Sequence, residues 1–345
     1  MMMKKTLIAS AVVATLGATS AQAATIAETD TTKVDMYGRI NLILESKSDR
    51  ASDESDSKIA DNGSRIGFKA SNQVNDNLKA FARAEFRFEG DDRDSRNSAR
   101  GVFQDLRNTY AGLEGGFGKL TVGNFDSIYY QATSSVLDVM ENTGYRALNS
   151  GSGRARGDTI AFETADLGGM EFGVAAKHYA NLDTNNNGET TDEAWNLQAY
   201  GQFNLIENLT LAIAFDQNNE DTDDALENDT NALGEDIFDP IIGASATYAV
   251  DNLSASLLLE TSGELLHIGA SAGYSYGSGD IYGLVSQWDN GTDSGMDMAV
   301  GANYKFSKSL RTYGELALGN DDVSDIRNKD NEGTSALTVG LRYDW

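Results

Sequence analysis

Residues 334–345 read TSALTVGLRYDW, and this C-terminal stretch indicates the fold class. Its apolar side chains fall on one face of an extended strand, at Leu337, Val339, Leu341, Tyr343 and Trp345. The positions between them carry Thr338, Gly340, Arg342 and Asp344. A repeat of two over this length predicts a β-strand with one apolar and one polar face. An apolar face that ends in two aromatic residues is typical of a strand whose outer surface meets lipid, although in a soluble sandwich it would point into a core.

The beginning of the chain has the pattern of a secretory signal peptide. Lys4 and Lys5 precede an apolar run over residues 7–16, and Ala21-Gln22-Ala23 forms an A-x-A cleavage site. The apolar run is too short to span a bilayer, and the alternative interpretation is a retained N-terminal anchor. We predict that residues 1–23 are the signal peptide and that residues 24–345 form the mature protein.

The composition narrows the class further. The chain has 345 residues with no cysteine, one proline, 35 glycines and a mean hydropathy of −0.40. No composition shift marks a domain boundary, and no later segment has the ~20 apolar residues of a membrane helix. The net charge of −26 makes nucleic acid an unfavourable partner. A secreted chain with alternating apolar residues and no helical span predicts an all-β outer-membrane barrel.

Alternating segments recur along the chain and are separated by turn residues. Strands are expected near residues 33–46, 64–74, 77–90, 105–114, 118–125, 157–165, 169–180, 194–205, 207–218, 240–250, 252–262, 264–276, 278–289, 296–306, 309–320 and 334–345. The count of sixteen is even, as in bacterial antiparallel barrels. Short turns such as Asp251-Asn252 alternate with long polar loops such as 47–63 and 126–156. This segregation of loop lengths favours a transmembrane barrel over a soluble one.

The early strands show which face points inward. Arg83, Glu85 and Arg87 alternate with Ala84 and Phe86. Lipid does not accept so many charges, so the charged face must line the inside of the barrel. A sixteen-stranded barrel with a charged interior is wide enough to hold water, and the pattern therefore predicts an aqueous channel.

Several short motifs carry a resemblance to a known family. They are VDMYGR at 34–39, SRIGFK at 64–69, YAGL at 110–113, GKLTVGN at 118–124 and the terminal aromatic strand. In this order they resemble the Gram-negative general porins, the trimeric sixteen-stranded class of the outer membrane, over essentially all of residues 24–345. The family usually ends in Phe, and Trp345 departs from that pattern. Tyr343 and Trp345 are the expected signal for the outer-membrane assembly machinery.

The resemblance also implies a constriction. In such porins the third long loop folds into the barrel, and here that loop is 126–156, with Asp138 and Glu141 at the positions of the family's carboxylates. The family often has Pro before this Glu, whereas here the one proline is Pro240. The family's opposing basic wall maps onto Arg39, Arg65 and Arg107, with Arg154 or Arg156 at the start of the sixth strand. Strand alternation places Arg83 and Arg87 on the same interior face. Glu85 lies between them and is expected to neutralise part of their charge.

The functional prediction is passive diffusion of small hydrophilic solutes and ions through a homotrimer among outer-membrane lipids and lipopolysaccharide. Carboxylates and arginines on opposite sides would set up a transverse field, and the acidic loops predict weak to moderate cation preference. The alternatives are a substrate-specific porin and a surface adhesion or receptor barrel.

Enzymatic and metal-binding functions have little support in the sequence. The chain has two histidines, His178 and His267, and no legible catalytic constellation, so no enzyme activity and no cofactor are expected. The segment 183–194 begins like a calcium loop but has Ala194 where that loop needs Glu, so it is interpreted as a surface loop.

Overall fold

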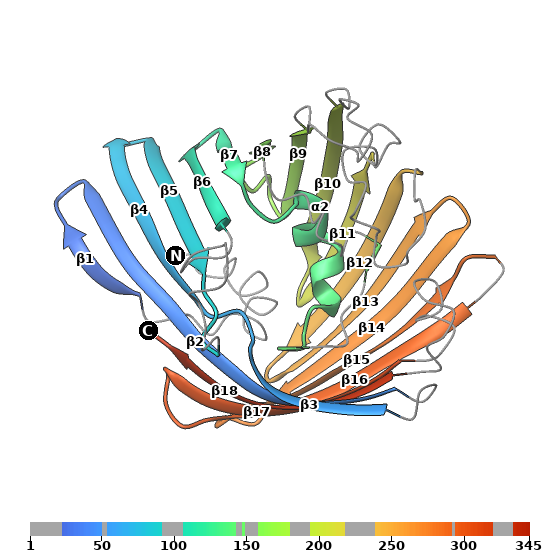
Figure 1. Ribbon diagram of the computed structural model, residues 1–345. Coiled ribbons are helices and arrows are strands. Elements are labelled where there is room, and N and C mark those ends of the chain that lie inside the picture. Colours follow the sequence, from blue (N-terminus) through green and yellow to red (C-terminus); the bar gives the residue numbers. More distant parts are fainter. Residues whose placement is uncertain are drawn as a thin grey trace, which may run out of the picture.

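The computed structural model describes residues 23–49, 54–91, 106–142, 147–148, 158–179, 194–217, 239–291, 294–319 and 334–345. Within them, one antiparallel sheet closes on itself to form a barrel (Figure 1). The strands are β1 (Ala24–Glu28), β2 (Thr32–Asp49), β3 (Glu54–Asp61), β4 (Arg65–Asn75), β5 (Leu78–Arg87), β6 (Leu106–Gly115), β7 (Gly118–Asn124), β8 (Thr159–Glu163), β9 (Met170–Tyr179), β10 (Ala194–Ile206), β11 (Leu209–Asp216), β12 (Ile241–Val250), β13 (Leu253–Ser262), β14 (Leu265–Ser275), β15 (Asp280–Asp289), β16 (Ser294–Lys305), β17 (Leu310–Gly319) and β18 (Thr334–Asp344). Two short helices, α2 (Ile128–Ala132) and the 3-10 helix η1 (Ser134–Leu137), follow β7.

These strands occupy sixteen positions around the barrel, as the sequence predicts. β3 and β4 both pair with β2, along its second and first halves respectively, and form one interrupted strand. β1 pairs with the beginning of β2, where Ala24 lies opposite Met36. It therefore extends the barrel wall without adding a position to the ring.

The ring is closed by pairing between its first and last strands. β18 runs antiparallel to β2 from Thr334 opposite Asp49 to Asp344 opposite Arg39. Beyond this ladder, Gly38 and Trp345 exchange two backbone hydrogen bonds, of 3.0 and 3.1 Å. A side chain at Gly38 would collide with the Trp345 indole. Glycine here lets the terminal ring lie against the strand, and the closed ladder leaves no free sheet edge at this seam.

The two faces of the sheet differ as the alternation predicts. In β18, Leu337, Val339, Leu341 and Tyr343 are about half exposed on the outside of the barrel, whereas Arg342 is buried on the inside. The same division holds in β2, where Leu44 is exposed and Glu45 is buried. The outer surface is therefore an apolar belt, and the polar and charged side chains face the lumen. Within the described residues, no helix has the length and apolarity needed to cross a membrane.

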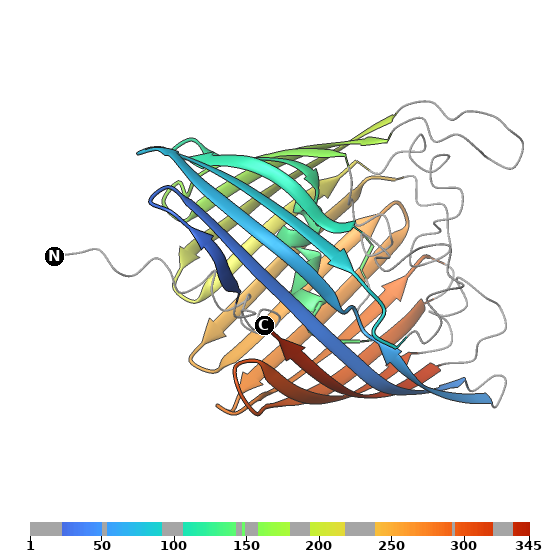
Figure 2. The ribbon, with the colours of Figure 1, turned by 60° about the vertical axis from the view of Figure 1, so that its left-hand side comes forward.

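The connections at one end of the barrel are short. Two-residue turns join β4 to β5, β10 to β11 and β12 to β13, and the strands run obliquely between the two ends (Figure 2). At the other end, the predicted loop 47–63 is wrong. Residues 45–49 instead pair with residues 54–58, so β2 and β3 continue the wall. Both faces of this arm are polar, which removed the apolar alternation by which a strand is identified in the sequence.

The connection after β7 enters the barrel, as predicted for the loop 126–156. The helices α2 and η1 lie inside it, and α2 is on the inner side of β10 and β11 (Figure 1). The Ser127 side chain caps α2 by accepting a hydrogen bond from the Tyr130 backbone N–H, 3.0 Å away. This cap satisfies a donor that a helix as short as α2 would otherwise leave free.

Replacing an outward side chain tests the lipid-facing assignment. Leu257 lies in the middle of β13 and is 61% exposed on the outer face. We expect Leu257→Arg to lower the free energy of unfolding by about 2–4 kcal/mol, because a guanidinium group would enter hydrocarbon. Leu257→Ala is the uncharged control and should cost clearly less. Urea unfolding in phospholipid measures both variants, and equal losses would contradict a lipid-facing Leu257.

Candidate functional site

Arginines form a ladder across the first strands of the barrel, on its inner face. Arg39 on β2 lies directly opposite Arg65 on β4, and Arg65 lies directly opposite Arg87 on β5. Like charges at directly opposed positions repel one another. The arginine ladder therefore requires carboxylates close by. Glu85 is paired with Arg65, and Asp344 is paired with Arg39.

Glu85 is the carboxylate at the centre of this wall. Its side chain is 1% exposed and accepts hydrogen bonds from Arg83 at 2.7 Å and from Arg65 at 3.5 Å. The Tyr37 hydroxyl donates to the same carboxylate at 2.9 Å, and Arg107 lies 3.7 Å away. One carboxylate thus compensates three guanidinium groups, which leaves this part of the wall with a net positive charge.

A second basic pair lies on the last two strands. Arg311 on β17 is directly opposite Arg342 on β18. Glu141 from the inserted loop binds both, with its Oε1 2.5 Å from Arg311 and its Oε2 3.0 Å from Arg342. Asp344 connects this pair to the ladder by contacts with Arg342 at 2.9 Å and with Arg39 at 3.1 Å. Glu141 is therefore held in ion pairs on the basic wall, whereas the resemblance implies a position opposite that wall.

The backbone of the loop is also held at this point. Glu315 on β17 accepts hydrogen bonds from the backbone N–H groups of Glu141 and Asn142, at 2.7 and 3.0 Å. The Asn142 side chain donates to Glu45 and to Thr338, each at 2.8 Å. The loop thus reaches the wall at β17, β18 and β2 through a fixed set of polar contacts.

The helical part of the loop packs on apolar and small side chains instead. Ile128 and Phe125 contact Ala161 and Ala175 on β8 and β9. Leu137 packs on Leu258, and a side chain added at Gly269 would collide with Leu137. Small residues on the inner faces of these strands leave room for the loop, so the loop occupies one side of the lumen.

Asp138 follows η1 directly and is half-buried. Its Oδ2 accepts a hydrogen bond from the Tyr130 hydroxyl at 2.5 Å. Because η1 packs on β12 to β14, and β12 and β13 lie half-way around the sixteen-position ring from β4 and β5, Asp138 is on the side of the barrel opposite the arginine ladder.

Other predicted site residues have different positions. Arg154 and Arg156 lie outside the described residues. The rings of Tyr343 and Trp345 stack with their centroids 6.3 Å apart, and Tyr343 lies on the outer face.

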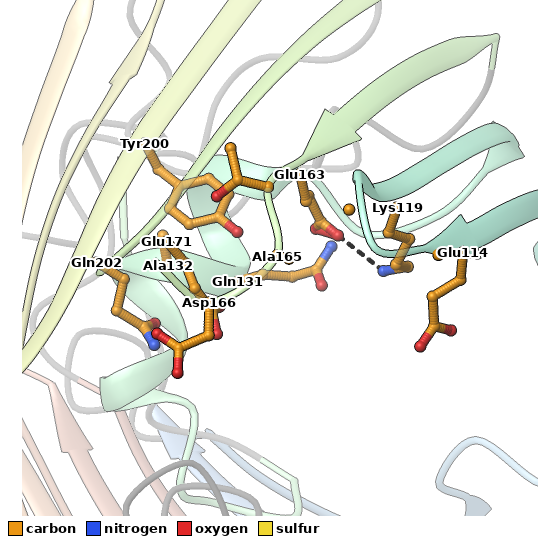
Figure 3. A pocket seen from close by; sticks show the side chains of 13 residues that line it. Glu114, Lys119, Gln131, Ala132, Glu163, Ala165, Asp166, Glu171, Tyr200 and Gln202 are labelled. Carbon is orange, nitrogen blue, oxygen red and sulfur yellow. Dashed lines mark hydrogen bonds and ion pairs between the residues drawn. The ribbon is translucent and has the colours of Figure 1, made fainter. Parts of the chain in front are cut away.

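A cavity of about 420 Å³ lies between α2 and the short-turn ends of β6 to β10 (Figure 3). Its acidic lining residues are Glu114, Glu163, Asp166 and Glu171. Lys119 is the one basic residue in the lining and binds Glu163 at 2.8 Å. The cavity is therefore acidic. Among the described residues, no cluster of three histidine, cysteine or acidic side chains has the geometry of a metal site.

Comparison with known proteins assigns the family. Residues 9–324 match the family described as Gram-negative porin. The chain belongs to the Gram-negative porins. A "Monosaccharide porin" of Halomonas sp is 26% identical over 99% of this chain and 100% of its own. This porin is thus an outer-membrane channel protein, and porins are passive channels and not enzymes.

Solved structures share the fold of this porin. An "Anion-selective porin from Comamonas acidovorans" superposes with a TM-score of 0.69 at 17% identity, covering 91% of this chain and 100% of the other. OmpT of Vibrio cholerae, in-vitro folded and described as a trimer form, has a TM-score of 0.63 at 15% identity, covering 92% of this porin and 100% of OmpT. At these low sequence identities, the similarity to the solved structures shows only that the fold is shared.

Several residues of the site were not among the sequence candidates. Arg311, Glu315 and Glu260 all lie at inward positions of their strands. Alternation is consistent with an inward position for all three, but the resemblance maps the basic wall onto earlier strands and assigns no role to Arg311. Their contacts with the loop have no local sequence signal, because 112 to 174 positions separate the partners.

Removing the charge of Glu85 should unbalance the basic wall. In Glu85→Gln, three guanidinium groups lose their shared carboxylate, so we expect the zero-current potential in a KCl gradient to shift toward anion preference. The free energy of unfolding should fall by about 1–3 kcal/mol, since these arginines still reach water. Glu114→Gln is the matched control, because Glu114 is 48% exposed and pairs with Lys79 at the barrel end. An equal shift in both variants would contradict a special role for Glu85.

Proposed function

We propose that this porin is a non-specific diffusion channel for small hydrophilic solutes and ions, with weak to moderate cation preference. The observation that carries this proposal is the separation of charge across the lumen. Six arginines share Glu85, Glu141 and Asp344 on one side, and Asp138 lies on the other. The six arginines are Arg39, Arg65, Arg83, Arg107, Arg311 and Arg342.

This separation supports a transverse electric field in the narrowed section. Opposite charges act strongly on one another across a passage with walls of low dielectric constant. A polar solute can align its dipole in such a field, whereas an apolar solute must displace oriented water without compensation. In this proposal, anions pass close to the arginine wall and cations pass close to Asp138.

The cation preference rests on the charge of the whole chain. The net charge of −26 raises the cation concentration near the channel mouths, although salt screens this effect beyond about 8–10 Å. The basic wall opposes this bias, and for that reason the expected preference is weak to moderate.

We further propose that the working unit is a homotrimer in contact with outer-membrane lipids and lipopolysaccharide, formed after residues 1–23 are removed. The resemblance of the motifs supports the trimer, as does the trimer form described for OmpT of Vibrio cholerae. The outward Tyr343 and the adjacent Trp345 are the proposed signal for the assembly machinery.

Planar-bilayer recording tests both proposals. We expect conductance steps in groups of three that grow linearly with salt, together with a zero-current potential on the cation-preferring side. The steps test the trimer, and the potential tests the preference. A potential on the anion-preferring side would overturn the cation preference, and steps that occur singly would overturn the trimer.

Two single substitutions test the transverse field. Asp138→Asn should reduce cation preference, and Arg65→Ala should increase it, because the two side chains have opposite charges on opposite sides of the lumen. The shift in zero-current potential in a KCl gradient measures both effects. Shifts in the same direction, or shifts no larger than that of Glu114→Gln, would show that these side chains are ordinary solvated lumen charges.

A monosaccharide-selective channel is the second candidate, since the Halomonas relative is described as a monosaccharide porin. Ion current measured with increasing glucose separates the two. A non-specific channel loses current only in proportion to solution conductivity, whereas a sugar-binding channel shows saturable block.

A further inference from the structure

His267 is buried beneath the inserted loop, on the inner face of β14. Its side chain is 0% exposed, and its ring stacks on Trp288 of β15 with a centroid separation of 3.8 Å and an interplanar angle of 10°. Its Nδ1 lies 2.9 Å from Oε2 of Glu260 on β13, a residue that is also 0% exposed. A histidine and a glutamate thus form a buried pair that no part of the proposed conduction mechanism uses.

Glu260 holds the loop at two points. Its Oε1 accepts a hydrogen bond from the Tyr129 hydroxyl on α2, at 2.9 Å, and its Oε2 accepts one from the Leu148 backbone N–H, at 3.1 Å. Tyr129 lies where the loop enters the barrel, and Leu148 follows the contact with β17 and β18. One carboxylate therefore ties the outgoing and returning parts of the loop to the same strand.

The donors around Glu260 set the tautomer of His267. The carboxylate already receives the Tyr129 hydroxyl and the Leu148 N–H, so the imidazole contributes a third hydrogen bond when Nδ1 carries its proton. Its Nε2 is buried and has no hydrogen-bond partner among the described residues.

We propose that His267 is a positioning residue for the constriction loop. Its stack on Trp288 fixes the imidazole, and its hydrogen bond to Oε2 holds the Glu260 carboxylate in the orientation that binds both arms of the loop. Without this hydrogen bond the buried carboxylate loses one of its donors and can turn away from Tyr129 and Leu148. The loop then fluctuates more, and the channel current fluctuates with it.

Single-channel current noise at fixed voltage tests this proposal. We expect His267→Ala, which loses both the donor and the stacked ring, to show open-channel noise several-fold above that of the unmodified protein. In His267→Asn, the amide keeps a donor near the position of Nδ1, so the noise should stay close to that of the unmodified protein.

A matched control uses the only other histidine of the sequence. His178 contacts Trp195 on β9 and β10, outside the loop contacts, so His178→Ala should keep the low noise of the unmodified protein. The proposal is overturned if His267→Ala is as quiet as the unmodified protein, or if His267→Asn is as noisy as His267→Ala. If His267→Ala does not fold, His267→Leu, which fills much of the volume of the ring without supplying a donor, takes its place. Ion preference is recorded in the same experiment and should be unchanged in His267→Asn. A failure of the proposed selectivity is therefore distinguishable from a failure of the proposed role of His267.

Discussion

The structure depends on one requirement, that every backbone N–H and C=O group inside the membrane find a partner within the chain. A β-sheet meets this requirement only when its first and last strands pair. Here the closing contact runs along β2 and β18 and ends in the two hydrogen bonds between Gly38 and Trp345. Once the ring is closed, strand alternation alone sends apolar side chains to the lipid and charged side chains to the lumen.

The same arrangement occurs three times in the lumen: a buried glutamate accepts hydrogen bonds from several donors. Glu85 gathers arginines of the wall, Glu315 holds the loop backbone near Glu141, and Glu260 joins the two arms of the loop. A buried carboxylate is stable only when its lone pairs are satisfied, so each of these residues fixes the position of its partners. These glutamates therefore fix both the position of the loop and the positions of several arginines in the lumen.

The fold could be predicted almost completely because alternation is a local signal. The sixteen positions and the inward-facing charges of the early strands follow from patterns within single segments, whereas the entry of the loop after β7 follows from the resemblance to the porins. The pairing of residues 45–49 with residues 54–58 could not be predicted, because these residues are polar on both faces of the sheet. The partners of Glu141 and the role of Glu260 could not be predicted either, since a carboxylate gives no sign of which distant donor it will meet. The small residues on the strands beneath α2 could not be assigned a role from the sequence, because small residues occur in strands for many reasons and only the packed loop explains them here.

The pairing of β2 with β18 also has a consequence in time. Arg39 on β2 and Asp344 on β18 bond to each other across 305 positions of sequence. β2 is therefore synthesised long before the strand with which it closes the ring. Until then β2 carries a row of unpaired backbone groups, and any other strand edge can bind to it. The loss of chain entropy for so long a loop is also incurred in the final step of closure. For this reason the chain is most open to wrong pairing before β2 and β18 meet.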